Sequence, residues 1–405
     1  MAKQTKRYLT SMTVTKRKTF LYFTTISLFV VGFYIARLRS SAPKYDTQHG
    51  QFVSKTFRNS SVMHGKSKLP CKEITQVVYI KTHKTASSTT NSVVQRFGYN
   101  RGLVFALPKD GHIFNERHLF TRQLLQYQRP PSNQSIHFNI IASHLRYNRP
   151  ELDKVVPNAT YITIIRNPIH RFESAFGFNN YASKLKLTKS KNPLEEFMKN
   201  PDKYVKRIRG VTRDLLRNGM SFSLGFDHRF DDSDSAINEM IDKLDNELDL
   251  VLISDYFEES LVLLKNVLCW KFDDILYISK RIRSENRRYM ISKSVADRIL
   301  KWNKADVKLY EHFNYTFWKK VNIYGADFYK ELQEYRTRLQ QFQEECVDKN
   351  QTKILDGREE AIIRRAKSSI QCRLAFITTA PFHNILKKEA AESYNISTKN
   401  GTEHR

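Results

Sequence analysis

Residues 77–89 decide the fold that this sequence predicts, and they run Val77-Val78-Tyr79-Ile80-Lys81-Thr82-His83-Lys84-Thr85-Ala86-Ser87-Ser88-Thr89. The first four residues are apolar and typical of a buried strand, whereas the next nine are basic and rich in hydroxyl groups. A helical pattern of apolar residues begins near Ser92. The start of a helix offers unpaired backbone N–H groups and the positive end of the helix dipole. Together with the Lys84 ammonium group, this arrangement predicts a loop that binds an anion.

The general motif nearest to this loop is the Walker A sequence, G-x-x-x-x-G-K-[ST]. Lys84 and Thr85 match its last two positions, but both of its glycines are missing. Those glycines let the backbone wrap around a triphosphate, so their absence makes a P-loop kinase the least favoured enzyme. The loop better suits a smaller anionic group, such as a phosphosulfate or the end of a diphosphate.

The composition adds a strong positive charge and one candidate membrane segment. The 405 residues carry a formal net charge of +27, which favours nucleic acid, an anionic membrane, or anionic cofactors and glycans as partners. Residues 19–36 are uncharged, largely apolar and just long enough to span a bilayer. Six basic residues precede them, which places residues 1–18 in the cytosol. A retained signal anchor is favoured over a cleaved signal peptide, because Arg37 and Arg39 follow directly and no A-x-A site is present.

On this topology every residue after the anchor lies in the lumen or outside the cell, so nucleic acid is not an expected partner. Glycosylation sequons lie only after the apolar run, at Asn59, Asn133, Asn158, Asn314, Asn350, Asn395 and Asn400. The four cysteines also follow it and can pair in three ways. We expect Cys346 to pair with Cys372 in a local loop, which leaves Cys71 with Cys269. No C-x-x-C or H-x-x-x-H spacing indicates a metal, and none is predicted.

Strands and helices alternate through the middle of the chain. Beyond the first strand and helix, we expect strands at 137–143, 160–165 and 248–253 and helices at 169–178 and 256–268. Asn167-Pro168 marks the start of the helix at 169–178. This alternation predicts an α/β fold with a mostly parallel, doubly wound sheet, in which ligands bind at the carboxyl ends of the strands. Residues 185–234 are expected to form a helical and loop insertion beside the site.

The remaining segments frame this domain. Residues 37–70 are polar and basic and predict a flexible luminal stem. Residues 326–390 are expected to be a C-terminal helical segment, and 391–405 a disordered tail. Helices are expected at 295–303, 328–345 and 359–372.

Arg166 and Ser174 form a second candidate site. Arg166 ends the predicted strand at 160–165, and Ser174 lies two turns into the next helix. This spacing can bring a guanidinium and a hydroxyl to one phosphate, which arginine recognises through its planar fork. Taken alone, the pair fits an ordinary helix start with an exposed arginine better than a phosphate site. The anion-binding loop at 81–89 favours the phosphate site.

Four segments in this order resemble the galactose-3-O-sulfotransferase family: Tyr79 to Ala86, Ser143 to Asn148, Ile165 to Pro168 with Ser174, and Lys308 to Asn314 with Phe317-Trp318. The resemblance covers about 72–325. It implies a P-loop-like sulfotransferase core, so that 71–325 is the catalytic domain. It further implies a single-pass type II enzyme of the Golgi membrane that uses 3'-phosphoadenosine 5'-phosphosulfate (PAPS) and acts on O-3 of a terminal β-galactose in a glycolipid or glycoprotein glycan.

The resemblance also assigns residues to the donor. It places the 5'-phosphosulfate at Lys84, Thr85, Ser88 and Thr89, and the 3'-phosphate at Arg166 and Ser174. The predicted donor-binding set therefore consists of Lys81, Thr82, Lys84, Thr85, Ala86, Ser87, Ser88, Thr89, Arg166 and Ser174. The stretch Ala86-Ser87-Ser88 departs from the family, whose members often have a glycine there.

Sulfuryl transfer needs a base for the acceptor hydroxyl and a cation near the leaving phosphate. Lys84 is the predicted cation, and His83 and His144 are equal candidates for the base because each follows a predicted strand. Two alternatives stay open: a sulfotransferase for a uronic acid or hexosamine glycan, and a non-catalytic luminal membrane glycoprotein. Whether the acceptor is a glycolipid or a glycoprotein, and whether the protein is a homodimer, is also left open.

Overall fold

The structure is a computed structural model that describes residues 71–131, 137–279, 282–283, 288–355 and 359–402. The expected cytosolic tail, membrane anchor and stem lie outside these residues. None of the helices in the described ranges combines the length and the apolar character that crossing a bilayer requires.

A four-stranded parallel sheet organises the described residues. Its strands are β1 (Val77–Ile80), β2 (Ile140–Ser143), β3 (Thr160–Ile165) and β4 (Leu250–Ile253), in the order β2-β1-β3-β4. All three pairings are parallel, so the expected α/β class with a parallel sheet is confirmed. The chain moves from β1 to one side and then returns to the other, which is the switch that characterises doubly wound sheets. All four residues of β1 are fully buried, as an apolar run inside a parallel sheet requires.

Helices follow the strands as the alternation predicts. The part of the chain before β4 contains α3 (Ser87–Asn100), α4 (Arg149–Asp153), α5 (Pro168–Phe178), α6 (Tyr181–Lys184), α7 (Pro193–Lys199), α8 (Pro201–Val205), α9 (Val211–Asp214), α10 (Gly219–Ser223) and α11 (Asp234–Glu247), with 3-10 turns at Arg122–Leu124 and His228–Phe230. The Asn167 side chain accepts hydrogen bonds from the backbone of Ile169 and His170, so the predicted start of α5 is confirmed. The insertion at 185–234 is helices and loops, as expected.

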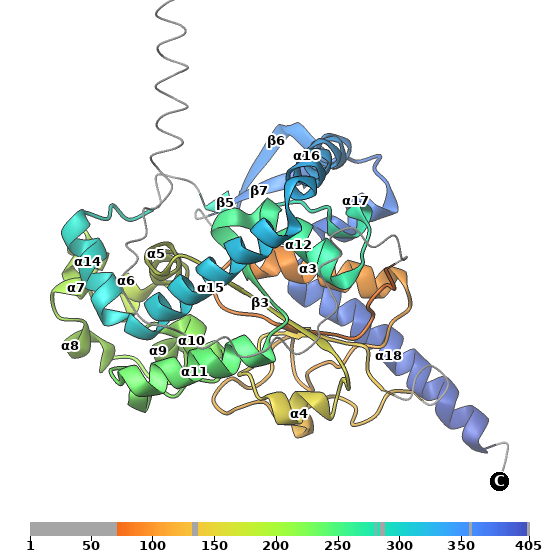
Figure 1. Cartoon of the computed structure of the whole chain (residues 1–405), viewed down its shortest axis with the longest axis horizontal. Coiled ribbons are helices and arrows are strands. Elements are labelled where there is room, and N and C mark those ends of the chain that lie inside the picture. The colour runs from red at the N-terminus through yellow and green to blue at the C-terminus, as the bar shows by residue number, and fades with distance from the viewer. Residues whose placement is uncertain (1–70, 132–136, 280–281, 284–287, 356–358, 403–405) are drawn as a thin grey trace, which may run out of the picture. The chain divides into compact units, whose positions relative to one another are not determined.

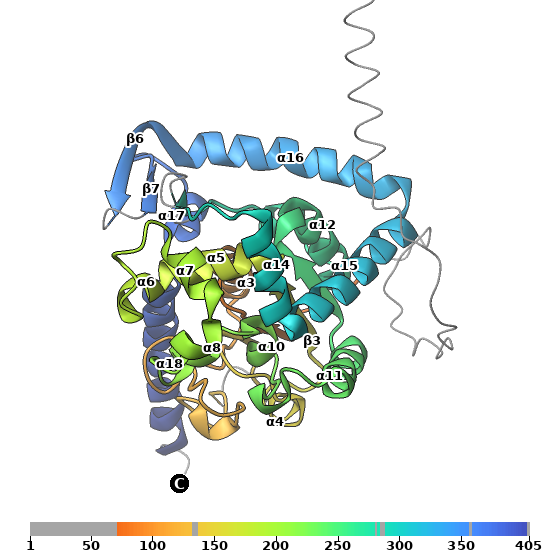
Figure 2. The same ribbon diagram turned by 90° about the vertical axis from the view of Figure 1, so that its left-hand side faces the viewer.

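The part of the chain after β4 covers the sheet with mostly longer helices. It contains α12 (Phe257–Leu268), α13 (Phe272–Ile275), α14 (Lys293–Trp302), α15 (Lys304–Tyr324), α16 (Ala326–Cys346), α17 (Ile370–Phe376) and α18 (Thr379–Thr402), with a 3-10 turn at Ser254–Tyr256. Both α12 and α15 pack against β4, and α3 packs against β2. Figure 2 shows α16 running from the end of α15 to the strands at the C-terminal side.

Two expectations for the C-terminal segment are wrong. A helix is expected at 359–372, but the chain forms β7 (Glu359–Arg364), which pairs antiparallel with β6 (Val347–Leu355) and β5 (Ile282–Arg283). The run Ala361-Ile362-Ile363 is apolar and contains two β-branched residues, and it pairs with the preceding β6 at six positions and with β5 at two. A disordered tail is expected from residue 391, but α18 continues to Thr402; this helix packs against α3, and its Tyr394 ring stacks on that of Tyr127. Figure 1 shows α18 beside α3.

The two disulfides confirm the expected pairing. Cys71 is bonded to Cys269 with Cα atoms 5.7 Å apart, and Cys346 is bonded to Cys372 with Cα atoms 5.2 Å apart. The first joins the segment before β1 to the end of α12, across 198 residues of sequence. The second joins α16 to α17 across 26 residues. The two disulfides therefore hold the segment before β1 against α12, and α16 against α17.

We expect the longer disulfide to stabilise the protein more. The chain-entropy estimate is about 5 kcal/mol for Cys71–Cys269 and about 3.5 kcal/mol for Cys346–Cys372. Urea unfolding of Cys71→Ser/Cys269→Ser and of Cys346→Ser/Cys372→Ser measures the two losses in the free energy of unfolding. An equal or smaller loss for the first pair would contradict the entropic account.

Candidate active site

The register of the sheet brings two predicted site residues together. Ile80, the last residue of β1, is paired with Ser143, the last residue of β2, so Lys81 and His144 follow side by side at the carboxyl edge. The Nδ1 of His144 lies 2.9 Å from the carbonyl oxygen of Lys81. Because a carbonyl only accepts, Nδ1 carries the proton, and Nε2 is the nitrogen with a lone pair. The adjacency that the sequence predicts for these strand ends is therefore present.

The loop after β1 has an unusual backbone. Lys84 has φ = 65° and Ala86 has φ = 61°, which is the left-handed region where glycine is preferred. Ala86 is the N-terminal cap residue of α3. Each non-glycine residue in this region costs on the order of 1 kcal/mol, so the rest of the protein must hold the loop in shape.

Three of the predicted donor-binding hydroxyls hold this shape. The hydroxyl of Thr82 lies 2.7 Å from that of Thr85 and also donates to the carbonyl of Ile164 on β3. The Ser87 hydroxyl donates to the carbonyl of Thr82 at 2.5 Å. Thr82, Thr85 and Ser87 are all buried. Their side chains brace the loop, so a contact from these positions to a ligand would have to come from backbone N–H groups.

The other predicted donor residues lie around Lys84. Arg166 donates through Nη1 to the carbonyl of Lys84 at 3.2 Å, which joins the end of β3 to the loop. The Lys84 ammonium lies 3.5 Å from the ring centre of Phe178, a cation–π contact. Ser174 precedes Phe178 by four residues on α5, so both project from the same face of that helix. Ser88 is exposed and Thr89 is half-buried in the first turn of α3.

A histidine–carboxylate pair lies on the other side of the loop. His83 Nε2 lies 2.9 and 3.1 Å from the two carboxylate oxygens of Glu116, which is 6 % exposed. The His83 ring stacks on that of His144, with centroids 3.8 Å apart and planes at 15°. Glu116 reaches this position because Phe114 donates to the carbonyl of His144, so its segment runs beside the end of β2. Burial lowers the pKa of His144 well below its usual range, and His83 and Lys81 add to the effect.

His83, Glu116 and His144 have side chains of the types that bind metal ions. Their ligand atoms all lie within 4.8 Å of one another. However, a metal ion lies in the plane of each imidazole that binds it, and these two rings are stacked in nearly parallel planes. The observed geometry therefore suits a hydrogen-bonded histidine–glutamate pair better than a metal centre.

Lys81 is a buried cation beneath the loop. Its side chain is 3 % exposed, and its ammonium donates to the hydroxyl of Thr379 at 3.4 Å. Burial lowers the pKa of Lys81 to about 7, the Glu116 carboxylate opposes this, and Lys84 adds to it. This side chain therefore changes charge near neutral pH and lies among the groups of the site.

The C-terminal helix α18 supplies the partners of this buried layer. His383 is 1 % exposed, and its Nε2 lies 2.8 Å from the hydroxyl of Ser143, directly before His144. Its Nδ1 lies 3.0 Å from the side-chain amide nitrogen of Gln95 on α3. Thr379 and His383 therefore connect α18 to β1, β2 and α3 at the carboxyl edge of the sheet.

No pattern in the sequence indicates that Glu116, Thr379 and His383 belong to the site, or that Phe178 is a partner of Lys84. Glu116 is a lone acidic residue in an irregular segment, and no spacing in the sequence links it to His83. Thr379 and His383 lie almost 300 residues after the loop. Phe178 is exposed at the end of α5, and no spacing in the sequence links its ring to Lys84.

A parallel sheet with a basic, hydroxyl-bearing loop at its carboxyl edge defines this chain as an α/β protein whose candidate site lies at the start of a helix. The model of the galactose-3-O-sulfotransferase family matches residues 1–368. The chain belongs to this family, as the resemblance of its motifs predicts. The matched residues end before α17, so Thr379 and His383 lie beyond them.

Individual relatives agree with the family match. Galactosylceramide sulfotransferase of Bos taurus is 37 % identical over 283 residues, which are 69 % of this chain and 65 % of that protein. Galactose-3-O-sulfotransferase 2 of Mus musculus is 31 % identical, over 72 % of this chain and 74 % of that protein. Galactose-3-O-sulfotransferase 3 of Bos taurus is 34 % identical, over 65 % and 62 %. The chain thus spans slightly less than two thirds of the galactosylceramide sulfotransferases that it matches.

The buried His383 predicts a loss of stability in acid. Burial lowers its pKa to about 4, whereas an unfolded histidine has a pKa of about 6.5. Between these pH values the unfolded chain binds more protons, so the free energy of unfolding falls as the pH drops through this window. The contribution of this one group is about 3 kcal/mol. Urea unfolding of His383→Gln between pH 7 and pH 4 should therefore show a smaller loss than the parent.

The exposed His118 provides the matched control, because His118→Gln removes a histidine that no burial affects. That variant should keep the parent's pH dependence. An unchanged pH dependence in His383→Gln would show that the pKa of His383 is not lowered in the folded protein, and would contradict its burial as the cause of acid instability.

Proposed function

We propose that this protein is a sulfotransferase that moves the sulfuryl group of PAPS to O-3 of a galactose in a glycolipid or glycoprotein glycan. The observation that carries the proposal is the position of Lys84 and the His83–Glu116 pair in one loop region of a member of the galactose-3-O-sulfotransferase family. A cation for the leaving phosphate and a base for the acceptor hydroxyl are the two groups that this reaction requires.

The residues present fit a donor with two phosphate-bearing ends. Lys84, the exposed Ser88 and the N-terminus of α3 offer donors to the phosphosulfate. Arg166 and Ser174 are the proposed contacts of the 3'-phosphate. The guanidinium has five N–H donors, so its bond to the Lys84 carbonyl is compatible with a phosphate contact. That bond would also couple the two halves of the donor site.

The geometry favours His83 over His144 as the general base. The carboxylate of Glu116 at Nε2 fixes the orientation of the His83 ring and stabilises the cation that forms when the ring accepts a proton. His144 has a lowered pKa, which makes it a weaker base. We assign His144 to support of the His83 ring through stacking.

The proposed reaction is a direct displacement at sulfur. The galactose O-3 oxygen forms a bond to sulfur while the bond from sulfur to the bridging phosphate oxygen breaks. The hydroxyl proton passes to His83, and the leaving phosphate takes its negative charge beside Lys84. The products are the galactose 3-sulfate and 3'-phosphoadenosine 5'-phosphate.

We also propose the Golgi membrane as the location, with the catalytic domain in the lumen. The apolar run at 19–36 and its basic flank support this orientation. The two disulfides are consistent with an oxidising compartment. Of the sequons, Asn158 lies exposed in a turn before β3, whereas Asn314 lies within α15 with its side-chain oxygen buried. Endoglycosidase treatment should therefore lower the mass of the parent. The mass lost by Asn158→Gln should be smaller by one glycan.

Lys84→Ala should lower sulfate transfer by roughly a hundredfold or more, because the leaving phosphate loses its cation. Labelled PAPS with N-acetyllactosamine, galactosylceramide and lactosylceramide as acceptors measures transfer, and calorimetry with 3'-phosphoadenosine 5'-phosphate measures binding. Lys109→Ala, which removes an exposed lysine outside the loop, should leave both unchanged. Well-folded parent protein that transfers sulfate to no galactoside would refute the proposed function, and transfer only to uronic acid or hexosamine glycans would support the alternative enzyme.

Glu116→Gln should lower kcat with little effect on donor binding, since it removes the charge that stabilises protonated His83. A general base typically contributes about 10²–10⁴-fold, so His83→Ala should lose that much and Glu116→Gln a part of it. The double variant should be no slower than His83→Ala, because the glutamate acts through the histidine. Additive losses, or full activity of His83→Ala, would move the base to another group.

A further inference from the structure

The segment 184–213, which follows the candidate site on the α5 side, is strongly basic. It contains ten lysine and arginine residues but three acidic residues. All ten basic residues are exposed. The segment therefore contributes a local excess of seven positive charges within thirty residues, which is a quarter of the net charge of the whole chain.

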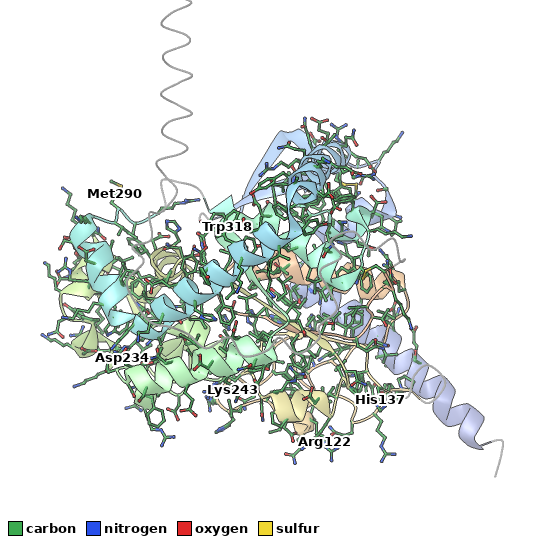
Figure 3. The ribbon with its side chains drawn as sticks, viewed as in Figure 1. Arg122, His137, Asp234, Lys243, Met290 and Trp318 are labelled. Carbon is green, nitrogen blue, oxygen red and sulfur yellow. A yellow bond between two sulfur atoms is a disulfide. The ribbon has the colours of Figure 1, made fainter. Side chains whose placement is uncertain are left out.

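Several basic residues elsewhere in the described structure form ion pairs with carboxylates. Asp234, labelled in Figure 3, accepts hydrogen bonds from both Lys304 and Lys308. Arg336 on α16 pairs with Glu258 and Glu259 of α12. Among the described residues, Lys199 with Glu196 is the ion pair found within 184–213. The positive charge of this segment is therefore not neutralised locally.

The segment is a built surface rather than a loose loop. Its apolar residues alternate with the charges and enter a second hydrophobic cluster, which includes Leu185, Leu194 and Phe197. The rings of Phe172 and Phe176 on α5 and of Trp302 on α14 complete this cluster. Figures 1 and 2 show α6, α7 and α8 gathered beside α5 and α14. The basic side chains are therefore displayed on a packed scaffold.

This scaffold is directly continuous with the candidate active site. Phe178, which lies under the Lys84 ammonium, ends α5, and α6 begins three residues later at Tyr181. α5 and α6 pack against each other. The basic surface thus begins where the face of α5 that carries Ser174 and Phe178 ends.

We propose that the surface at 184–213 binds negative charge on the acceptor, so that the preferred acceptors are galactose-terminated glycans that carry a sulfate or carboxylate on a neighbouring sugar. This inference rests on the proposed function and adds a substrate class to it. The donor's charges are already matched by Lys84 and Arg166, which leaves the acceptor as the anion for this second surface. Several exposed charges acting together attract an anion most strongly at low ionic strength.

The test compares two acceptors that differ in one charged group: N-acetyllactosamine, and the same disaccharide with a 6-O-sulfate on its N-acetylglucosamine. The variant Lys189→Glu/Lys191→Glu/Lys206→Glu reverses three exposed charges of the surface. The matched control, Lys72→Glu/Lys243→Glu/Lys367→Glu, reverses three exposed lysines outside the segment. KM is measured for each acceptor at 50 and 300 mM salt, and calorimetry measures acceptor binding without turnover.

The parent and the control should have a KM for the sulfated acceptor several-fold lower than for the neutral one at 50 mM salt, and the difference should shrink at 300 mM. The surface variant should lose the difference and keep the kcat for the neutral acceptor. Equal KM values for the two acceptors in the parent, or the same preference in the surface variant, would overturn the proposal. So would charge-dependent binding to phosphatidylserine vesicles without any preference for the sulfated disaccharide. Absence of turnover with both acceptors, while calorimetry still shows preferential binding of the sulfated one, would refute the proposed function and not this surface.

Discussion

The pairing of β1 with β2 and β3 is the constraint on which the site depends. It aligns Ile80 with Ser143 and with Thr163, so that the residues after β1 and β2 emerge together. Because side chains alternate between the faces of a strand, a shift of one residue would turn every side chain of β1 to the opposite face. Because all of β1 is buried, such a shift would disrupt the packing of its side chains on both faces of the sheet. The contact between His144 and Lys81 is a direct result of this fixed register.

The site concentrates charged groups that are expensive to bury. Lys81 and Glu116 are both almost fully buried, and an unpaired buried charge costs several kcal/mol. Each is therefore given a partner from a distant part of the chain: Thr379 for Lys81 and His83 for Glu116. The left-handed residues Lys84 and Ala86 add strain to the same loop. The core around the sheet must supply the stability that keeps these groups in place.

The sequence predicts what local pattern determines. The strand at 160–165 and the start of α5 after Asn167 follow from β-branched residues and an N-terminal cap, and both are present. The basic, hydroxyl-rich loop after β1 and the position of a histidine beside each strand end follow from the same kind of signal. Glu116, Thr379 and His383 could not be predicted in this way, because their roles arise from contacts between segments far apart in the chain. The strand β7 forms through antiparallel pairing with β6 at six positions and with β5 at two, which the periodicity of its own residues does not indicate.

The dependence of the sheet edge on α18 has a consequence for the order of folding. The N-terminal strands leave the ribosome first, and the folding of a domain can begin before synthesis ends. The buried partners of Lys81 and Ser143, which are Thr379 and His383, lie 298 and 240 residues further along the chain. The sheet and its loop can therefore assemble early, but Lys81 and Ser143 gain these partners only when α18 docks. A chain truncated before α18 would leave both polar groups without these partners, even though every residue of the matched family region would be present.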